Sequence, residues 1–448
     1  MQALWCSRSR VCRSASEYSA LAAYACALPL PFAAMSPDRS PTYCDRINFL
    51  LQLASSLHNY GTTAQRLEAA ITKVATRLEL RCNPWSNPTG LILSVSDARI
   101  PVEENPPETT RVVRLEPGDI DLGRLAAADA IAEQVLSGQM QLADGASALR
   151  ALTAPTPTRD LVAMGASFGL ASASVAGLLG SGWADIATAA VIGWVIGAMY
   201  LLGAGRPRLF EALDAIAALL ATLLATAVAF WLVPINLKTV VMASLIVLLP
   251  GLTLANAVSE LSSQHLVSGT ARFAGAVVTL LKLTFGTVAA TQLARVLGWI
   301  PPEPTVVLAP SWLEWASLAL ATLAFCILFR AKMRDWPVVI AAAVVGYLTS
   351  RYVGGAMGNE VGVFAAGFAI TALSNVYARR FKRPGATVRV PGVILLVPGS
   401  VGFRSLSFVF ERDVFLGLDT GFALVTVLIS LVAGMLFGNL LVPTRSTL

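Results

Sequence analysis

Two copies of one short phrase mark where helices of this chain are expected to break and free polar backbone groups. Ile246–Gly251 reads IVLLPG, and Ile394–Gly399, 148 residues later, reads ILLVPG. Proline lacks a backbone N–H and disrupts the helix before it. Because lipid offers no replacement hydrogen bonds, such a break must face protein or a water-filled cavity. Paired breaks at matching points of two halves predict a transporter's binding site.

Polar side chains follow both breaks, and they suit the two charged ends of an amino acid. Freed carbonyls attract an ammonium group, and a helix N-terminus attracts a carboxylate. Arg404 is predicted to hold a carboxylate bidentately, and Asn256 to bond either end. The alternative for each break is an ordinary proline kink. The alternative for Arg404 is a position at the membrane interface, where its side chain extends outward or pairs with Glu411. The predicted substrate-binding residues are Pro250, Gly251, Thr253, Asn256, Pro398, Gly399, Ser400 and Arg404.

Ionisable residues within apolar segments form a second group of candidates. Lys282 lies near the middle of one such segment, where a charge costs about 2.5–3.5 kcal/mol on insertion scales. We therefore expect Lys282 to face the protein interior, where it pairs with an acid, binds an anion or titrates. Glu260 and Asp214 are its candidate partners, and they are also candidate proton carriers. The alternative is a purely structural ion pair.

Other chemical patterns are absent or fit a simpler explanation. Gly165–Gly169 reads GASFG and matches the nucleophile elbow, but that chemistry needs a strand-turn-helix setting and a histidine. Small residues that let helices pack closely explain the pattern better. His58 and His265 are the only histidines; His58 is interpreted as a packed helix residue, and a multi-histidine metal site is excluded. With no Walker A loop either, no catalytic residue, metal or cofactor is predicted, and we expect the protein not to be an enzyme.

The composition places the chain in a membrane. Of its 448 residues 55% are hydrophobic and 13% are charged, and the mean hydropathy is +0.66; soluble domains are far less apolar. Residues 1–158 are mixed, whereas residues 160–442 contain one membrane-length window after another. The net charge of +6 does not indicate a nucleic-acid partner, because the cations lie in short loops between apolar segments.

Ten windows are long and apolar enough to span a bilayer. They are residues 160–180, 183–203, 211–233, 239–259, 271–297, 311–329, 336–354, 359–378, 390–410 and 418–441. With the N-terminal region inside, most loop cations fall on the inner side, and Lys238, Arg295, Arg351 and Arg412 fall on the outer side. This partition follows the positive-inside rule. Five spans per half is an odd number, so the second half enters from the opposite side, and the repeat is predicted to be inverted.

The region before the spans has a different character. Residues 1–41 are interpreted as a disordered leader, or as a start assigned upstream of Met35. Apolar residues recur at helical spacing over residues 44–81. Gly61 is predicted to end the first helix, and Thr62 or Thr63 to cap the second. Residues 91–95 and 111–115 are predicted strands, with Pro84, Trp85 and Pro88 in a rigid loop between elements. Residues 122–136 and 142–152 are predicted helices. The predicted domains are therefore an α+β domain over 42–158 and five-span repeats over 159–300 and 301–448.

Several stretches resemble the threonine/serine exporter family. They are Phe49–Leu80, Gly118–Leu149 (which begins GDIDLG), Leu248–Leu261 (LLPGLTLANAVSEL) and Val390–Leu406 (VPGVILLVPGSVGFRSL). The family joins a soluble N-terminal region to about ten spans, and the likeness extends over roughly residues 45–445. No single stretch is highly specific, but their order along one chain is.

The resemblance implies export of small hydroxy amino acids, threonine and serine, driven by the proton-motive force. A related two-subunit system implies the alternative of dicarboxylates such as succinate, and a membrane-tethered hydrolase is a more distant alternative. The implied partners are the amino acid, protons and the lipid bilayer, with a possible homo-oligomer. The expected location is the inner (plasma) membrane, with the N-terminal domain in the cytoplasm. Alanine at Arg404 or Lys282 is expected to abolish export.

Overall fold

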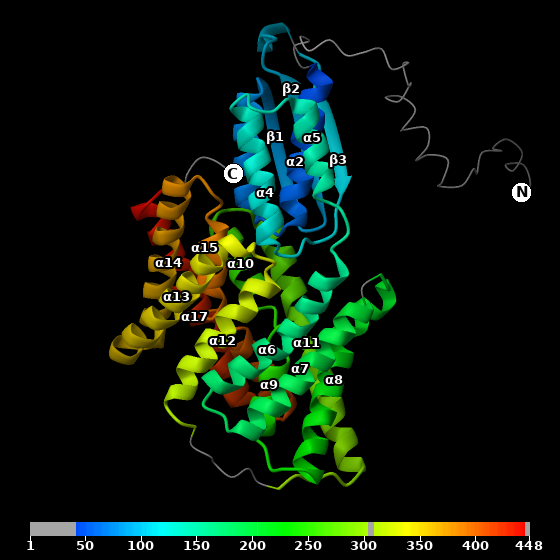
Figure 1. The fold of residues 1–448 in the computed structure, drawn as a ribbon, viewed down its shortest axis with the longest axis vertical. Helices are drawn as coiled ribbons and strands as arrows, with labels where there is room; N and C mark the ends of the chain where they lie inside the picture. The colour runs from blue at the N-terminus through cyan, green and yellow to red at the C-terminus, as the bar shows by residue number, and fades with distance from the viewer. Residues whose placement is uncertain (1–41, 105, 204, 303–308, 444–448) are drawn as a thin grey trace, which may run out of the picture. The chain divides into compact units, whose positions relative to one another are not determined.

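A computed structural model describes residues 42–104, 106–203, 205–302 and 309–443. The predicted leader, residues 1–41, lies outside these ranges. Residues 43–152, which we call the N-terminal part, combine helices with one sheet (Figure 1). Its elements are α2 (Tyr43–Asn59), α3 (Ala64–Arg77), β1 (Leu80–Asn87), β2 (Gly90–Asp97), η1 (Val102–Glu104), β3 (Thr109–Arg114), α4 (Leu122–Leu136) and α5 (Leu142–Ala151).

The sheet is antiparallel with the order β1-β2-β3. Side chains alternate along a strand, and Leu91, Leu93 and Val95 of β2 are all buried. The two predicted strands are confirmed. The predicted loop around Pro84 and Trp85 is wrong, because both residues belong to β1. This strand lies at the edge of the sheet, where a proline's missing N–H is tolerated.

Two apolar helix faces pack to form the core of the N-terminal part. Leu50, Leu53, Leu67 and Ile71 from α2 and α3 are all 0% exposed. The predicted break between these helices is confirmed at Gly61, whose φ of +79° is a backbone conformation that glycine adopts readily. Helix α2 packs on β2 and helix α3 on β1, while α4 and α5 pack against α2 (Figure 1).

His58, at the end of α2, is buried as the sequence predicts. Its Nε2 donates to the Glu116 carbonyl at 3.1 Å. Burial lowers the pKa of His58 below 6.5, and the bond to the Glu116 carbonyl opposes this shift. As pH falls through about 6.5 the unfolded chain therefore takes up the proton more readily, so the free energy of unfolding is highest above that pH and falls below it.

We expect the melting temperature of the protein in detergent to fall between pH 7.5 and pH 5.5, and we expect His58→Gln to reduce that fall. The comparison uses the slope with pH, because the substitution itself also changes stability. Equal slopes in the two proteins would contradict this role for His58.

The remaining helices are apolar. They are α6 (Thr158–Leu178), α7 (Trp183–Gly203), α8 (Pro207–Trp231), α9 (Leu237–Ser244), α10 (Gly251–Ser262), α11 (Leu266–Val296), α12 (Trp312–Leu328), η2 (Met333–Asp335), α13 (Trp336–Met357), α14 (Asn359–Phe381), α15 (Ala386–Ile394), α16 (Gly399–Phe410) and α17 (Val414–Leu441). Among the described residues, 8 helical segments are long and apolar enough to cross a membrane, and α12 is a shorter apolar helix. The protein is a polytopic helical membrane protein.

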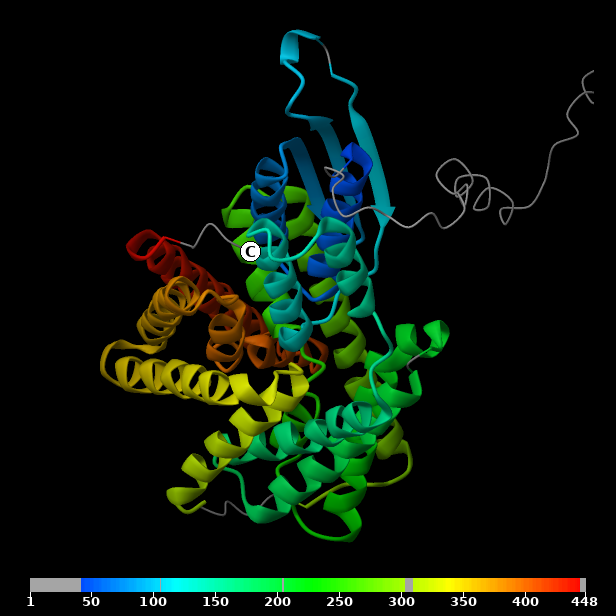
Figure 2. The same ribbon diagram turned by 45° about the horizontal axis from the view of Figure 1, so that its top comes forward.

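The two halves of this region contain matching sets of helices. In each half one helix is broken into two: α9 and α10 in the first half, α15 and α16 in the second. The contacts within the halves also match: α6–α7 corresponds to α12–α13, α8–α11 to α14–α17, and α10–α11 to α16–α17. Between halves, α6 packs on α12, α10 on α16, and the pairs α11–α16 and α10–α17 are equivalent. Figure 2 shows the same helices from a second direction.

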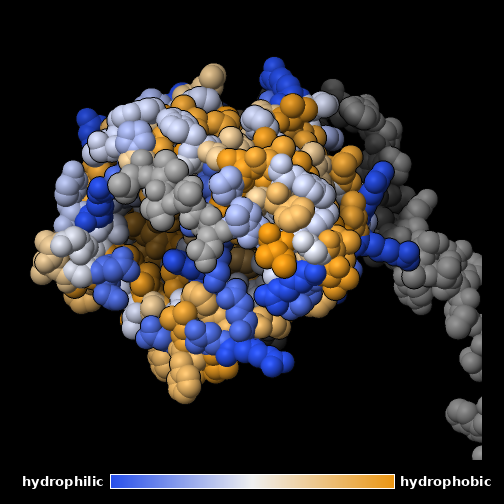
Figure 3. All heavy atoms as spheres, turned by 90° about the horizontal axis from the view of Figure 1, so that it is seen from below, coloured by the Kyte–Doolittle hydropathy of each residue, from blue (hydrophilic) through white to orange (hydrophobic). Residues whose placement is uncertain are grey.

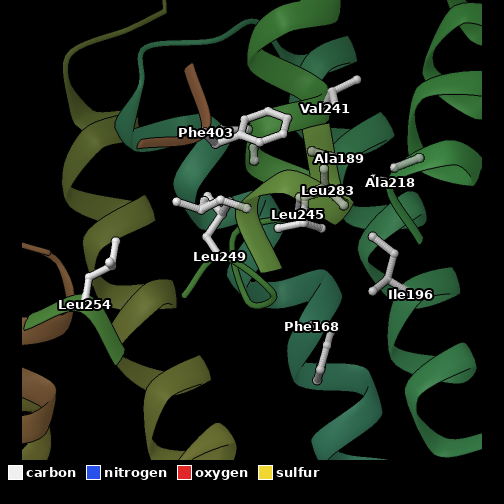
Figure 4. Close-up of a cluster of buried hydrophobic side chains, with 14 of the residues drawn as sticks. Phe168, Ala189, Ile196, Ala218, Val241, Leu245, Leu249, Leu254, Leu283 and Phe403 are labelled. Carbon is white, nitrogen blue, oxygen red and sulfur yellow. The ribbon is translucent and has the colours of Figure 1, made fainter. Parts of the chain in front are cut away.

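One apolar cluster joins both halves. It includes Phe168 and Leu283 from the first half and Phe403 and Leu431 from the second. Figure 4 shows Leu245 and Leu249, from the segment before the first break, in this cluster together with Phe403. Seen from below, the surface presents many hydrophobic side chains beside hydrophilic ones (Figure 3). The breaks are therefore held within a packed core that both halves share.

Candidate functional site

The two Pro-Gly elements adopt the same backbone conformation and lie against each other. Pro250 precedes α10 with φ −80° and ψ 39°, and Pro398 precedes α16 with φ −83° and ψ 41°. A Cβ added to Gly399 would lie 3.0 Å from both the Cα and the N of Gly251. Each break thus begins a helix, and the first residues of the two helices are in direct contact.

A cavity of about 550 Å³ opens beside this contact, and we call it the large cavity. Its volume falls within the roughly 300–1,000 Å³ common for small-molecule sites. Both breaks contribute to its wall through Pro250, Gly251, Thr253, Gly399 and Ser400. Apolar side chains from α6, α12 and the segments before the breaks complete most of the remaining wall.

Four further polar side chains line the large cavity: Asp119, Tyr200, Arg330 and Tyr347. The Tyr200 hydroxyl donates to Asp119 Oδ2 at 3.2 Å. Arg330 contacts Asp121 Oδ2 at 3.5 Å. A carboxylate and a guanidinium that line the same cavity are complementary to the ammonium and carboxylate groups of an amino acid.

No local pattern marks the four polar wall residues as a group, because they come from four separate segments of the chain. Asp119 lies in the stretch GDIDLG, which carried the family resemblance without a role for its acids. Arg330 follows the window 311–329 and has the character of a loop cation, and Tyr200 lies near the end of the window 183–203. The acidic pair within GDIDLG was the one signal available, since two carboxylates directly before a helix are more than a cap requires.

The other predicted substrate residues lie elsewhere. Asn256 lines a second, smaller chamber, which is described below. Pro398 is buried but is not among the residues that line the large cavity. Arg404 is exposed on α16 and lines neither cavity, so the alternative of an outward position fits it better. The substrate site proposed below is therefore built without Arg404.

Lys282 pairs with the acid Asp214, which is one of the three roles expected for it. Its Nζ donates to the Glu211 carbonyl at 2.8 Å and lies 3.7 Å from Asp214 Oδ2. Lysine and aspartate lie on α11 and α8, which pack along each other. Neither residue lines the large cavity. The pair thus forms a separate polar site between two helices of the first half.

Glu260 is buried and joins the N-terminal part to the broken helix α10. Its side chain is 1% exposed. One carboxylate oxygen accepts from Ala64 N at 2.9 Å; the other accepts from Ser268 Oγ at 2.7 Å and from Arg272 Nε at 3.1 Å. Thr63 occupies the N-cap position of α3 without a side-chain cap. Glu260 supplies an acceptor to that helix end instead, and its negative charge suits the positive end of the helix dipole.

Further contacts fix the N-terminal part to the membrane helices. His265 Nε2 lies 3.1 Å from Glu68 Oε2. The Leu122 amide donates to the Phe329 carbonyl at 3.0 Å. A Cβ on Gly123 would lie 2.6 Å from the Arg330 carbonyl, so this glycine permits the close approach. The N-terminal part therefore contacts membrane helices of both halves, at the start of α11 and at the end of α12.

The GASFG stretch packs helices together. A Cβ on Gly197 of α7 would lie 2.3 Å from the Gly165 carbonyl, and a Cβ on Gly169 would collide with the Trp194 ring. The Ser167 hydroxyl donates to the Met164 carbonyl within its own helix. The packing explanation is confirmed. A polar contact also joins two helices of the second half: Asn375 Nδ2 donates to Asn439 Oδ1 at 2.9 Å.

Several known proteins are similar in sequence to this chain. The relatives include an uncharacterised protein of Schizosaccharomyces pombe, 25% identical over 396 residues, which are 85% of this chain and 45% of that protein. The pheromone-regulated membrane protein 10 of Saccharomyces cerevisiae is 24% identical over 371 residues, 80% of this chain and 47% of its own. The chain spans less than half the length of these curated relatives. No solved structure matches the chain.

Family models cover most of the sequence. A model described as a putative threonine/serine exporter matches residues 48–294, and a second, described as a threonine/serine exporter, matches residues 314–441. The two matches follow each other on one polypeptide, and the boundary between them falls between the two helical halves. The chain therefore belongs to the threonine/serine exporter family, in its fused two-part form.

Proposed function

We propose that the protein is a secondary transporter that exports small hydroxy amino acids, threonine or serine, from the cytoplasm. The observation that carries this proposal is the large cavity at the contact of the two Pro-Gly elements. Asp119 would hold the substrate ammonium and Arg330 its carboxylate, while Thr253 and Ser400 would bond the hydroxyl. Both helix N-termini begin at this wall and add partial positive charge near the carboxylate.

The proposed mechanism is alternating access around the breaks. The matching helices and contacts of the two halves support an inverted repeat, in which one half rocks against the other. The N-terminal part would lie in the cytoplasm and the helices in the plasma membrane, because the loop cations then follow the positive-inside rule. Gly118, Asp119 and Ile120 line the cavity from the N-terminal side, so this segment would cover the inner opening.

A dicarboxylate is a poorer fit to the large cavity. Asp119 would repel a second carboxylate, and among the charged side chains that line the cavity only Arg330 is cationic. Hydrolysis also has little support, because the lining of this cavity contains no histidine or cysteine. The balance of charge therefore favours a zwitterion.

Counterflow in proteoliposomes tests the substrate and its site together. We expect internal threonine or serine to drive uptake of labelled threonine, with succinate inactive. Asp119→Asn and Arg330→Gln should each reduce the rate about tenfold or more, since a hydrogen bond to a charged group contributes roughly 1.5–3 kcal/mol. Arg295→Gln, an exposed arginine on α11, is the matched control. Succinate counterflow of equal rate, or normal rates in both site variants, would refute this assignment.

The Lys282–Asp214 pair is the proposed proton-coupling element. Removing the acid frees the lysine from its carboxylate partner, so proton movement and substrate movement should separate. In Asp214→Asn we expect counterflow to continue while an imposed pH gradient no longer drives accumulation. Glu211→Gln is the control, because only its backbone carbonyl contacts Lys282. Gradient-driven transport at the normal level in Asp214→Asn would show that the pair is structural.

A further inference from the structure

A second, smaller chamber lies between the N-terminal part and both broken helices, and we call it the arginine chamber. Its volume is about 70 Å³, enough for a few water molecules at roughly 10–15 Å³ each. The turn between α2 and α3 forms one wall. The first half of α10 contributes Leu252, Ala255 and Asn256, and α15 contributes Arg389, Val390 and Val393. Ile120 and Leu252 line both this chamber and the large cavity.

Three buried polar atoms of this wall have no hydrogen-bond partner among the described residues: Tyr60 Oη, Thr62 Oγ1 and Arg66 Nη2. An unpaired buried polar group costs about 1–3 kcal/mol, and a charged one costs more. All three side chains line the arginine chamber. Unpaired buried groups that share one small chamber indicate that something fills it.

The charge of the chamber specifies the occupant. Arg66 and Arg389 both line it, and they lie close enough to repel each other electrostatically. Burial lowers the pKa of Arg66 to about 10, which still leaves it charged at neutral pH. Asp129 also lines the chamber and has an interaction of its own. Among the described residues neither arginine forms an ion pair with an acid, and the two cations outnumber the single carboxylate that lines the chamber.

We infer that the arginine chamber is a binding site for a small oxyanion, a carboxylate or a phosphate group. Guanidinium groups bind both bidentately, and the Tyr60 and Thr62 hydroxyls and the Asn256 amide supply neutral donors. Water would fill the space but would not neutralise two neighbouring positive charges. Because the walls come from α3, α10 and α15, a bound oxyanion would hold the N-terminal part against both broken helices.

Thermal unfolding of the full chain in detergent tests this site. Sodium phosphate and sodium acetate are titrated against sodium chloride at constant ionic strength. We expect one or both to raise the melting temperature, with an apparent affinity reduced roughly 10- to 100-fold in Arg66→Gln and Arg389→Gln. Arg77→Gln, an exposed arginine on the same helix as Arg66, should respond like the unmodified protein. A response to phosphate alone identifies a phosphate ligand, and a response to acetate alone identifies a carboxylate.

A milder variant covers the case in which neither arginine variant folds. Tyr60→Phe removes one unpaired hydroxyl and keeps the ring, and we expect it to weaken the oxyanion response several-fold without loss of the fold. No response in the unmodified protein, or the same response in all variants, overturns the inference. The readout is binding and not export, so it is independent of the proposed function of the large cavity.

Discussion

Gly399→Ala is expected to lose most export activity while the protein still reaches the membrane. The added methyl group would lie 3.0 Å from the Cα and N of Gly251 and 3.4 Å from Leu249 Cβ. Backbone atoms cannot rotate aside as a side chain does, so the two broken helices must separate. Overpacking of this kind costs about 1–3 kcal/mol. Strain of this size in the conformation that moves the substrate lowers the export rate about 5- to 140-fold, because each 1.4 kcal/mol corresponds to a factor of ten.

Export of labelled threonine from preloaded vesicles measures this effect. Gly251→Ala should behave like Gly399→Ala, because its Cβ would lie 2.7 Å from Val397 Cγ1 and 3.3 Å from Gly399. Gly275→Ala is the matched control: it lies in the long helix α11, and a Cβ there meets nothing within 4 Å. Normal export in both break variants would show that the contact of the two elements does not matter for transport.

Most of the helices could be predicted from the sequence, from the periodicity of apolar residues and from the length of the apolar windows. The ten predicted windows correspond to the unbroken helices and to the two broken pairs, and the helices of the N-terminal part begin and end close to the expected residues. Strand β1 was missed because Pro84 and Trp85 resemble loop residues in sequence. The protein places them on a sheet edge, which is a tertiary fact that local composition does not contain.

The candidate site was predicted in part, and the repeat explains which part. The repeated Pro-Gly phrase predicts that the two helix breaks occupy equivalent positions, and the glycines of the two breaks are in contact. The same equivalence paired Asn256 with Arg404, yet Asn256 lines a chamber and Arg404 is exposed. The N-terminal part packs over the start of α10, and no second such part packs over α16 among the residues that the structure describes. A single added domain therefore breaks the symmetry on which the prediction relied.

Asp119 and Arg330 could not be predicted as site residues from the sequence, for a related reason. They are more than 200 residues apart in sequence, and they line the same cavity because the segment before α4 packs on the loop after α12, where Leu122 N donates to the Phe329 carbonyl and Arg330 pairs with Asp121. No local pattern encodes such a pairing, since side-chain convergence depends on how whole elements pack. The sequence thus indicates where the helices break, and the packing of the N-terminal part determines which charged groups surround the cavity.

Glu260→Ala is expected to loosen the packing of the N-terminal part on the membrane helices. The substitution removes the acceptor for Ala64 N and leaves Arg272, whose side chain is 17% exposed, without its ion-pair partner. Breaking a buried pair by removing one member costs about 3–5 kcal/mol. We therefore expect faster hydrogen exchange at the start of α3, a lower melting temperature and severely reduced export.

Two comparisons separate the ion pair from the helix cap. Glu260→Gln keeps an oxygen that can accept from Ala64 N, so it should lose the pair with Arg272 but protect the α3 amides better than alanine does. In the double variant Glu260→Ala with Arg272→Ala, no unpaired charge is left buried, and its loss of stability should be smaller than the two single losses added together. Glu360→Gln, an exposed carboxylate at the start of α14, should leave exchange and export unchanged. Unaltered exchange at Ala64–Leu67 in Glu260→Ala would mean that other contacts hold the N-terminal part, and the buried carboxylate would then need a different role.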